Sequence, residues 1–199
     1  MTGTPLYAPV LLAALFGLRR SEALGLKWSA INFNTKTITI DTTVVRQHQG
    51  NKVVTTVRDN MTKSETSTRS LPLCDFTTKE LQRIWHQQQD NRRLCGDCYD
   101  EKYLDFVCVS RMGTLINPDY VTQTFAKELE KNNLRHIRFH DLRHTFATLS
   151  LKNGVDVKTL SGALGHYSAG FILNVYTHAT PHMKREAADT IGNAINREM

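Results

Sequence analysis

The segment FHDLRHTFAT, residues 139 to 148, places three basic side chains within five positions. His140, Arg143 and His144 have the spacing i, i+3 and i+4, which puts them on one face of a helix. The opposite face would carry Leu142, Phe146 and Leu149. This is the pattern of a helix that lies on a hydrophobic core. A polar face that holds one guanidinium and two imidazoles is either solvated or surrounds an anion.

Three other places hold basic or titratable groups that packing alone does not require. In GLRRSEALGLKW, Arg19 follows a glycine and Glu22 lies three residues later, which by itself is an ordinary surface ion pair. Lys63 lies in TKSETS, a predicted turn. In LGHYSAGFILNVYTHAT, His166 follows a glycine and Tyr176 comes ten residues later. Taken singly, each group has a structural interpretation, such as a solvated turn lysine or a half-buried tyrosine.

Together, these motifs resemble the tyrosine recombinase (phage integrase) family, and within it the integrases of conjugative transposons. The matching motifs are GLRRSEALGLKW, TKSETSTRSLPL, FHDLRHTFAT, LGH and YTHAT, in the order of the family. The resemblance covers essentially the whole chain, so residues 1–199 are expected to form the family's C-terminal catalytic domain. The N-terminal core-binding and arm-binding domains of the family are expected to lie outside this chain.

The resemblance implies a reaction on DNA. A tyrosine attacks a phosphodiester and leaves a 3′-phosphotyrosine bond and a free 5′-hydroxyl, and the hydroxyl of a partner strand then rejoins the backbone. Tyr176 matches the nucleophile. Arg19 and Arg143 match the two catalytic arginines, whose forked donors suit the charged phosphate oxygens. Because fixed guanidiniums supply this charge, no metal and no cofactor are expected, and the motifs lack the paired carboxylates of a two-metal nuclease.

Four further positions take their roles from the same resemblance. His140 matches a general base or phosphate contact, and His166 matches a position that donates to a phosphate oxygen. Lys63 matches the hairpin lysine that protonates the 5′-oxygen leaving group. Glu22 matches an acidic position that orients a basic group. Three neighbours are left out of the predicted site, namely Arg20, His144 and Tyr167.

The elements that must position these residues are mostly helical. Apolar periodicity, capping residues and Gly or Pro signals predict them. The predicted helices are 5–16, 21–26, 77–93 with a Thr N-cap, 117–132 with Pro in its first turn, 140–152, 156–164 capped by Asp156, 168–177 and a last one that begins at Pro181. Runs at 31–45, 52–57 and 66–73 predict a small antiparallel three-stranded sheet, and 104–110 predicts a short buried apolar segment. The fold class is therefore α+β, mainly α-helical.

The composition is compatible with this interpretation. A formal net charge of +6 suits a polyanionic partner. No stretch is long and apolar enough to cross a membrane, and the apolar segment 6–20 carries its basic residues after it, unlike a signal peptide. A cytoplasmic protein is therefore expected. Cys95 and Cys98 have the spacing of half a zinc site, but no second half follows, so they are interpreted as a reduced pair.

The resemblance also implies partners. These are double-stranded DNA at attachment or transposon-end sites, other protomers in a synaptic tetramer, and excisionase or DNA-bending accessory proteins. The apolar spacing of residues 181–199 predicts an amphipathic helix. This helix either docks on a neighbouring protomer, as such tails do in the family, or folds back on its own domain.

Other functions share parts of this pattern. A type IB topoisomerase-like enzyme or a telomere-resolving strand transferase would use the same chemistry. A non-catalytic DNA-binding relative would keep only the fold, and a metal-dependent nuclease would need carboxylates that are missing here. The spacing from His166 to Tyr176 favours the recombinase, and the filling of all six catalytic positions argues against a degenerate relative.

Overall fold

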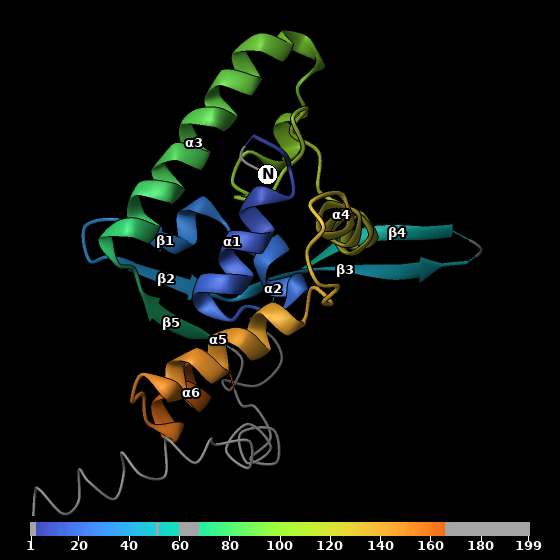
Figure 1. Ribbon diagram of the computed structural model, residues 1–199. Helices are drawn as coiled ribbons and strands as arrows, with labels where there is room; N and C mark the ends of the chain where they lie inside the picture. Colours follow the sequence, from blue (N-terminus) through green and yellow to red (C-terminus); the bar gives the residue numbers. More distant parts are fainter. Residues whose placement is uncertain (1–2, 51, 60–67, 166–199) are drawn as a thin grey trace, which may run out of the picture.

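The computed structural model describes residues 3–50, 52–59 and 68–165. Its helices gather around α1 (Tyr7–Phe16) and α2 (Arg20–Gly25), which lie in the middle of the molecule (Figure 1). The other helices are α3 (Asp75–Cys95), α4 (Pro118–Lys131), α5 (Asp141–Lys152) and α6 (Val157–Leu164), with 3-10 turns at η1 (Trp28–Ala30), η3 (Gly96–Cys98) and η4 (Glu101–Tyr103). Lys63, His166, Tyr176 and the predicted helices 168–177 and 181–199 lie outside the described residues.

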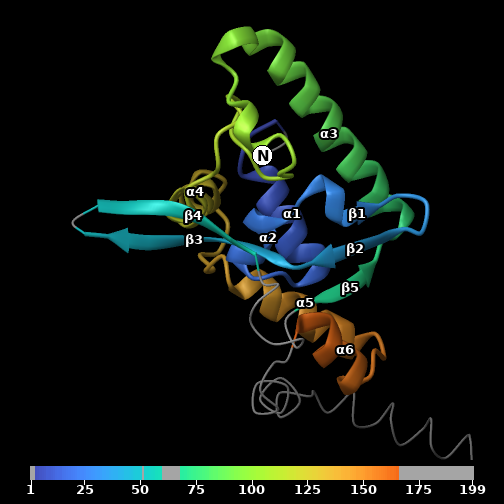
Figure 2. The same ribbon diagram turned by 180° about the vertical axis from the view of Figure 1, so that it is seen from behind.

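The strands of the described ranges form two antiparallel units. A three-stranded sheet has the order β1 (Ile31–Asn32), β2 (Thr37–Ile40) and β5 (Arg69–Pro72), while β3 (Thr42–Gln49) and β4 (Lys52–Asp59) form a separate hairpin. This hairpin extends away from the body of the molecule on the side of α4 (Figures 1 and 2). The α+β, mainly helical class is confirmed.

The predicted small antiparallel three-stranded sheet is present, but its strands differ from the predicted ones, because the run 52–57 and the second part of 31–45 form the separate hairpin. Burial alternates without interruption through Ile38, Ile40, Thr42 and Val44, so the sequence pattern carries no mark of the break at Asp41. The pairing partner changes there instead. Ile40 pairs with Arg69 of β5, but Thr42 pairs with Asp59 of β4.

Helix starts follow the capping chemistry of the sequence, with one correction. The Asn117 side chain accepts from the backbone of Asp119, and that of Asp156 accepts from the backbone of Thr159, as expected for N-caps. The Thr N-cap predicted for 77–93 was wrong, because α3 begins two residues earlier, with Cys74 as its N-cap. The Thr77 hydroxyl instead donates to the Cys74 carbonyl, as hydroxyl side chains do inside a first helical turn.

Helix α5 corrects the interpretation of its two faces. Its buried residues are Arg143, Ala147 and Leu151, spaced by four, whereas Leu149 is 53% exposed. The predicted polar face therefore points inward at Arg143. Burial of an arginine is tolerated only where acceptors meet its guanidinium, and the apolar pattern of the helix does not reveal acceptors on other elements.

Two apolar clusters support this framework. The main one joins α1, α2, the three-stranded sheet, α3, the buried segment 106–109 and α4. Its most buried members include Leu12, Leu24, Ile38, Leu81, Val107 and Val121. A smaller cluster of Ala147, Leu151, Leu160 and Leu164 joins α5 to α6. Among the described residues, no helix combines the length and the apolarity that a membrane span requires.

Candidate active site

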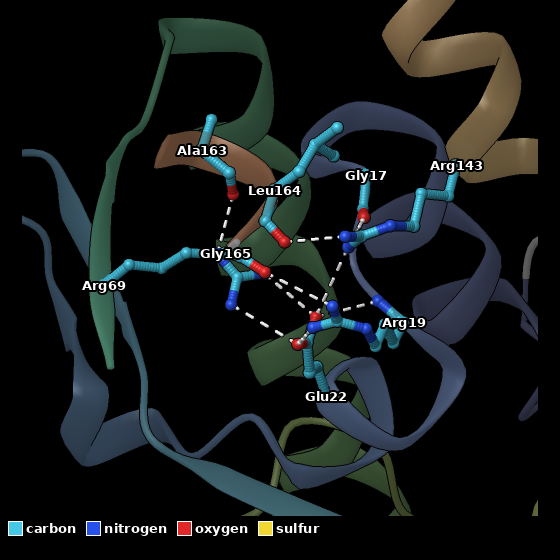
Figure 3. A network of polar contacts seen from close by, with 8 residues as sticks. All are labelled: Gly17, Arg19, Glu22, Arg69, Arg143, Ala163, Leu164 and Gly165. Atoms are coloured by element: carbon cyan, nitrogen blue, oxygen red, sulfur yellow. Dashed lines mark hydrogen bonds and ion pairs between the residues drawn. The ribbon is translucent and has the colours of Figure 1, made fainter. Parts of the chain in front are cut away.

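Glu22 lies at the centre of a cluster of arginines (Figure 3). It is 5% exposed and occupies the third position of α2, from which its Oε2 accepts the backbone N–H of Arg19 at 2.9 Å. This is half of a capping box, and it places an acidic group at the positive end of the helix. The Arg19 guanidinium donates from Nη1 to Glu22 Oε1 at 2.6 Å. The predicted pairing of Glu22 with a basic group is present.

Two more arginines reach Glu22 from distant parts of the chain. Arg69 of β5 donates from Nη1 to Oε1 at 3.3 Å and from Nη2 to Oε2 at 2.9 Å. Arg143 of α5 approaches Oε2 with its Nη1 at 3.8 Å. One carboxylate thus meets three guanidiniums, which come from the N-cap of α2, from β5 and from α5.

The same three arginines donate to three successive carbonyls at the end of α6 (Figure 3). Arg69 Nε donates to Ala163 at 2.6 Å, Arg143 Nη2 to Leu164 at 2.6 Å, and Arg19 Nη2 to Gly165 at 3.3 Å. The last carbonyls of a helix have no intrahelical partner and carry partial negative charge, so cations are favourable there. The chain immediately before His166 is therefore held by the arginine cluster.

Two glycines permit this close assembly. Gly17 has φ +63°, and its carbonyl accepts from Arg143 Nη1 at 2.6 Å. A Cβ at Gly17 would lie 2.5 Å from the ring of Phe146. Gly165 has φ +68°, and a Cβ there would lie 2.8 Å from Arg69 Nη1. Both positions need a left-handed backbone and a missing side chain, which glycine alone provides without strain.

The ionisation of Glu22 reflects its neighbours. Burial on its own would raise the pKa of the Glu22 carboxyl, but hydrogen bonds and positive charge from Arg69, followed by those from Arg19, hold this pKa below its ordinary value. Glu22 is therefore an anion at neutral pH, and it provides a fixed counter-charge for the guanidiniums.

The two imidazoles of the HDLRH motif lie beside each other at the start of α5. His140 is the N-cap residue and is exposed, and its ring centroid lies 4.9 Å from that of His144. Partial burial lowers the pKa of His140, and the nearby His144 and Arg143 lower it further. The pKa of His144 is also lowered, mainly by burial. A neutral His140 can accept a proton, as a general base must.

A basic cleft of about 620 Å³ opens next to His140. Arg20, Arg46 and Arg138 line it together with His140. Arg46 is paired with Asp119, Arg138 with Asp141, and Arg20 donates to the hydroxyl of Thr122. Burial lowers the pKa of Arg20, and the positive charge of the nearby Arg46 lowers it further.

The predicted site residues fall into three groups. Arg19, Glu22 and Arg143 come together, although the side chain of Arg19 is 40% exposed and that of Arg143 only 1%. His140 lies at the start of α5, three residues before Arg143, and burial, His144 and Arg143 together lower its pKa. The other three predicted residues, Lys63, His166 and Tyr176, lie outside the described residues.

Arg69 was not included in the predicted site. Its signal in the sequence is weak but physical. In TSTRSLPL, Arg69 is two residues before Leu71, so both side chains leave the same face of a strand. Leu71 is buried, which makes Arg69 an inward-facing arginine.

Comparison of the sequence with known proteins identifies the family of this chain. The phage integrase family matches residues 2–183, and the chain belongs to that family. One relative is a tyrosine recombinase XerC-like protein of Caldanaerobacter subterraneus subsp. tengcongensis, 29% identical over 198 residues, which cover 97% of this chain and 50% of the relative. Another is the transposase from transposon Tn916 of Enterococcus faecalis, 28% identical over 87% of this chain and 42% of the relative. The chain thus spans about half the length of these relatives.

Solved structures show the same fold. The Tn1549 transposon integrase in complex with a circular intermediate DNA superposes with a TM-score of 0.72 at 21% identity, covering 94% of this chain and 58% of that chain. The XerA recombinase superposes with a TM-score of 0.63 at 24% identity, covering 95% of this chain and 57% of that chain. The predicted resemblance to the family and to conjugative-transposon integrases is confirmed.

Proposed function

We propose that this chain is the catalytic domain of a site-specific DNA recombinase of a mobile element, which integrates and excises DNA through a 3′-phosphotyrosine intermediate. One observation carries the proposal. Arg19 and Arg143, which are 124 positions apart by their numbers (143 − 19), converge on Glu22 and on the carbonyls immediately before His166. The motifs around Arg19 and Arg143 thus supply side chains to one cluster, and the Tn1549 transposon integrase, which has the same fold, was solved in complex with DNA.

In the proposed reaction, the oxygen of Tyr176 attacks the scissile phosphorus and its proton passes to His140. The bond from phosphorus to the 5′-oxygen breaks, and Lys63 supplies the proton that this oxygen takes. Arg19 and Arg143 neutralise the non-bridging oxygens in the transition state, and His166 donates to one of them. Rejoining is the reverse of these steps with the 5′-hydroxyl of a partner strand, so no external energy source is consumed.

Arg19 and Arg143 differ in exposure, so they differ in how readily they could bind a phosphate. Arg19 is 40% exposed and so is accessible to a phosphate in the described conformation, while Arg143 is buried and both of its terminal nitrogens donate to carbonyls. Arg143 would bind phosphate only after the segment around Gly17 or Leu164 shifts. Arg20, Arg46 and Arg138 around the basic cleft would hold the DNA backbone beside the scissile phosphate.

The partners are proposed on the same basis. The domain acts on double-stranded DNA, within a synaptic tetramer, together with the core-binding and arm-binding domains expected of the family and with excisionase or DNA-bending proteins. The segment 181–199 is a candidate for contacts between protomers. The protein is proposed to act in the cytoplasm.

A covalent adduct is the direct test. The protein is incubated with a suicide DNA substrate that carries its attachment site and a nick that lets the 5′ fragment escape. A protein–DNA adduct that survives denaturant is expected from the wild type, also in EDTA, and none from Tyr176→Phe. Tyr167→Phe is the matched control and should still form the adduct.

The possible outcomes separate the alternatives. An adduct from Tyr176→Phe removes Tyr176 as the nucleophile. Loss of cleavage in EDTA favours a metal-dependent nuclease. Tight DNA binding without any adduct supports a non-catalytic relative, and relaxation of supercoiled DNA without strand exchange supports a topoisomerase-like enzyme.

A further inference from the structure

Arg69 is a buried arginine whose contacts all lie within the candidate site. It is the first residue of β5, and its side chain is 8% exposed. Both terminal nitrogens donate to the two oxygens of Glu22, and Nε donates to the Ala163 carbonyl at 2.6 Å. Because this side chain is covered, it has no route to a substrate phosphate in the described conformation. Any effect on the reaction must pass through the groups that it binds.

Glu22 is held through both of its carboxylate oxygens by Arg69, a residue distant in sequence, as well as by its neighbour Arg19. Arg69 binds both carboxylate oxygens side by side, the forked arrangement that fixes a carboxylate in its plane and in its direction. Glu22 in turn holds the Arg19 guanidinium at 2.6 Å. Arg19 is a half-exposed side chain with many rotamers, so its acceptors, which include Glu22 and the Gly165 carbonyl, set its direction.

Arg69 also reaches the other side of the site. Its Nε holds Ala163, two residues before Gly165 and three before His166. A lysine could not make these contacts together, because one ammonium cannot span two carboxylate oxygens and a separate carbonyl in a planar fork.

We propose that Arg69 is a positioning residue of the active site, which holds the Glu22 carboxylate in its direction toward Arg19 and fixes the end of α6, immediately before His166 in the sequence. This inference rests on the proposed function, because its kinetic consequence is measured in DNA cleavage. Its electrostatic consequence is measured without DNA.

The kinetic test compares wild type, Arg69→Met, Arg69→Lys and Arg83→Met. Arg83 pairs with Glu80 on α3 and serves as the control for the loss of one ion-paired arginine. Single-turnover cleavage of the suicide substrate should slow roughly ten- to hundredfold in Arg69→Met, the range usual when a group that orients a reacting ligand is removed. Arg69→Lys should give an intermediate rate and Arg83→Met the wild-type rate, while DNA affinity stays equal in all four.

The pH profile separates positioning from a purely structural ion pair. Without the Arg69 cation, burial raises the pKa of Glu22, so Glu22 loses its charge at a higher pH. Cleavage by Arg69→Met should therefore recover as the pH rises, over a range in which the wild-type rate does not depend on Glu22. Carbon-13 titration of the Glu22 carboxyl, done without DNA, should show the same upward shift.

Three results would overturn the inference. The first is an equal cleavage rate in wild type and Arg69→Met. The second is a slower rate in Arg69→Met that only reflects loss of folded protein and keeps the wild-type pH profile. The third is a titration of Glu22 that is unchanged in Arg69→Met. If Arg69→Met does not fold, the same readouts on Arg69→Lys decide the matter. Absence of an adduct from the wild type would count against the proposed function alone, since the titration of Glu22 would still test the role of Arg69.

Discussion

A single carboxylate surrounded by three guanidiniums makes Glu22 the most consequential residue of the described site. Removal of one member of a buried ion pair is costly, because the remaining charge stays buried without compensation. Here the loss would leave Arg69 and Arg143, two nearly covered cations, close to each other. Glu22 therefore has two roles. Its negative charge offsets the repulsion between the neighbouring guanidiniums, and its oxygens orient them.

Glu22→Ala should lower the free energy of unfolding by about 3–5 kcal/mol, the usual cost of an uncompensated buried charge. Glu22→Gln keeps acceptors of similar shape and should cost less. Urea unfolding at pH 7 measures both. Equal and small losses in the two variants would show that the cluster does not need its central anion.

The stability of the fold should depend on acid through Glu22. The folded-state pKa of this carboxyl lies below its ordinary value of 4.5. Its contribution is therefore fully present above about pH 4.5 and is lost as the pH falls through the folded-state pKa. Urea melts across the acidic range should show a shallower decline for Glu22→Gln than for wild type. Parallel curves would assign acid unfolding to other carboxyls.

His144 should tune the acid limb of the reaction through its neighbour. Its ring lies edge-on to His140, and its charge lowers the pKa of His140. His144→Gln removes that influence, so the pKa of His140 rises and the acid limb of the single-turnover cleavage profile moves to higher pH. His136→Gln, in the loop before α5, is the control and should leave the profile in place. An unmoved limb in His144→Gln would separate the two rings functionally.

At the scale of elements, the site consists of junctions rather than of helix faces. The arginines meet where α1 ends, where α2 and β5 begin and where α6 ends. Most helices, the N-caps Asn117 and Asp156 and a short buried segment, which is residues 106–109 within the predicted 104–110, could be predicted because local chemistry fixes them. The partner of each strand could not, because β2 and β3 share one unbroken alternation and differ only in the distant strand that pairs with each.

The same limit applies to the site. Arg19, Glu22 and Arg143 could be predicted from motifs, since short spacings carry them. The inward direction of Arg143 and the presence of Arg69 could not, because both depend on carbonyls and a carboxylate that other elements supply. A buried arginine is specified by its acceptors, and these are distant in sequence.

The junction at Gly17 should be sensitive to a single methyl group. Gly17→Ala places a Cβ against the ring of Phe146, while Gly154, also with positive φ, has open space around it. Gly17→Ala should therefore cost about 1–3 kcal/mol more than Gly154→Ala, which isolates overpacking from backbone strain. Urea midpoints of the two variants provide the comparison. Equal losses would mean that Phe146 yields without cost.

At the scale of the whole molecule, a central pair of helices is surrounded by units of unequal stability. The three-stranded sheet and α1 contribute to the main core, whereas the outer half of the β3–β4 hairpin is exposed. Few buried apolar contacts hold this outer half, and such segments open locally without global unfolding. We therefore expect the arginine cluster to be rigid and the outer half of the β3–β4 hairpin to open locally.

Hydrogen exchange should resolve this difference. Amides of α1 and β2 are expected to exchange only through global unfolding, and those of residues 46–50 and 52–54 much faster through local opening. Exchange measured in increasing denaturant separates the two routes. Protection of the hairpin equal to that of α1 would show that it is a rigid part of the domain.

The long sequence separations within the arginine cluster determine when the cluster can form during synthesis. Arg19 and Gly165 are 146 residues apart, and Arg143 spans 126 residues to reach Gly17. On the ribosome, the contact with Gly17 can form only after Arg143 has emerged, and the contact with Gly165 only after Gly165 itself has emerged. The helices α1 and α2 appear early and must wait for most of the domain, so a nascent chain carries the first arginine of the site long before it holds the complete cluster.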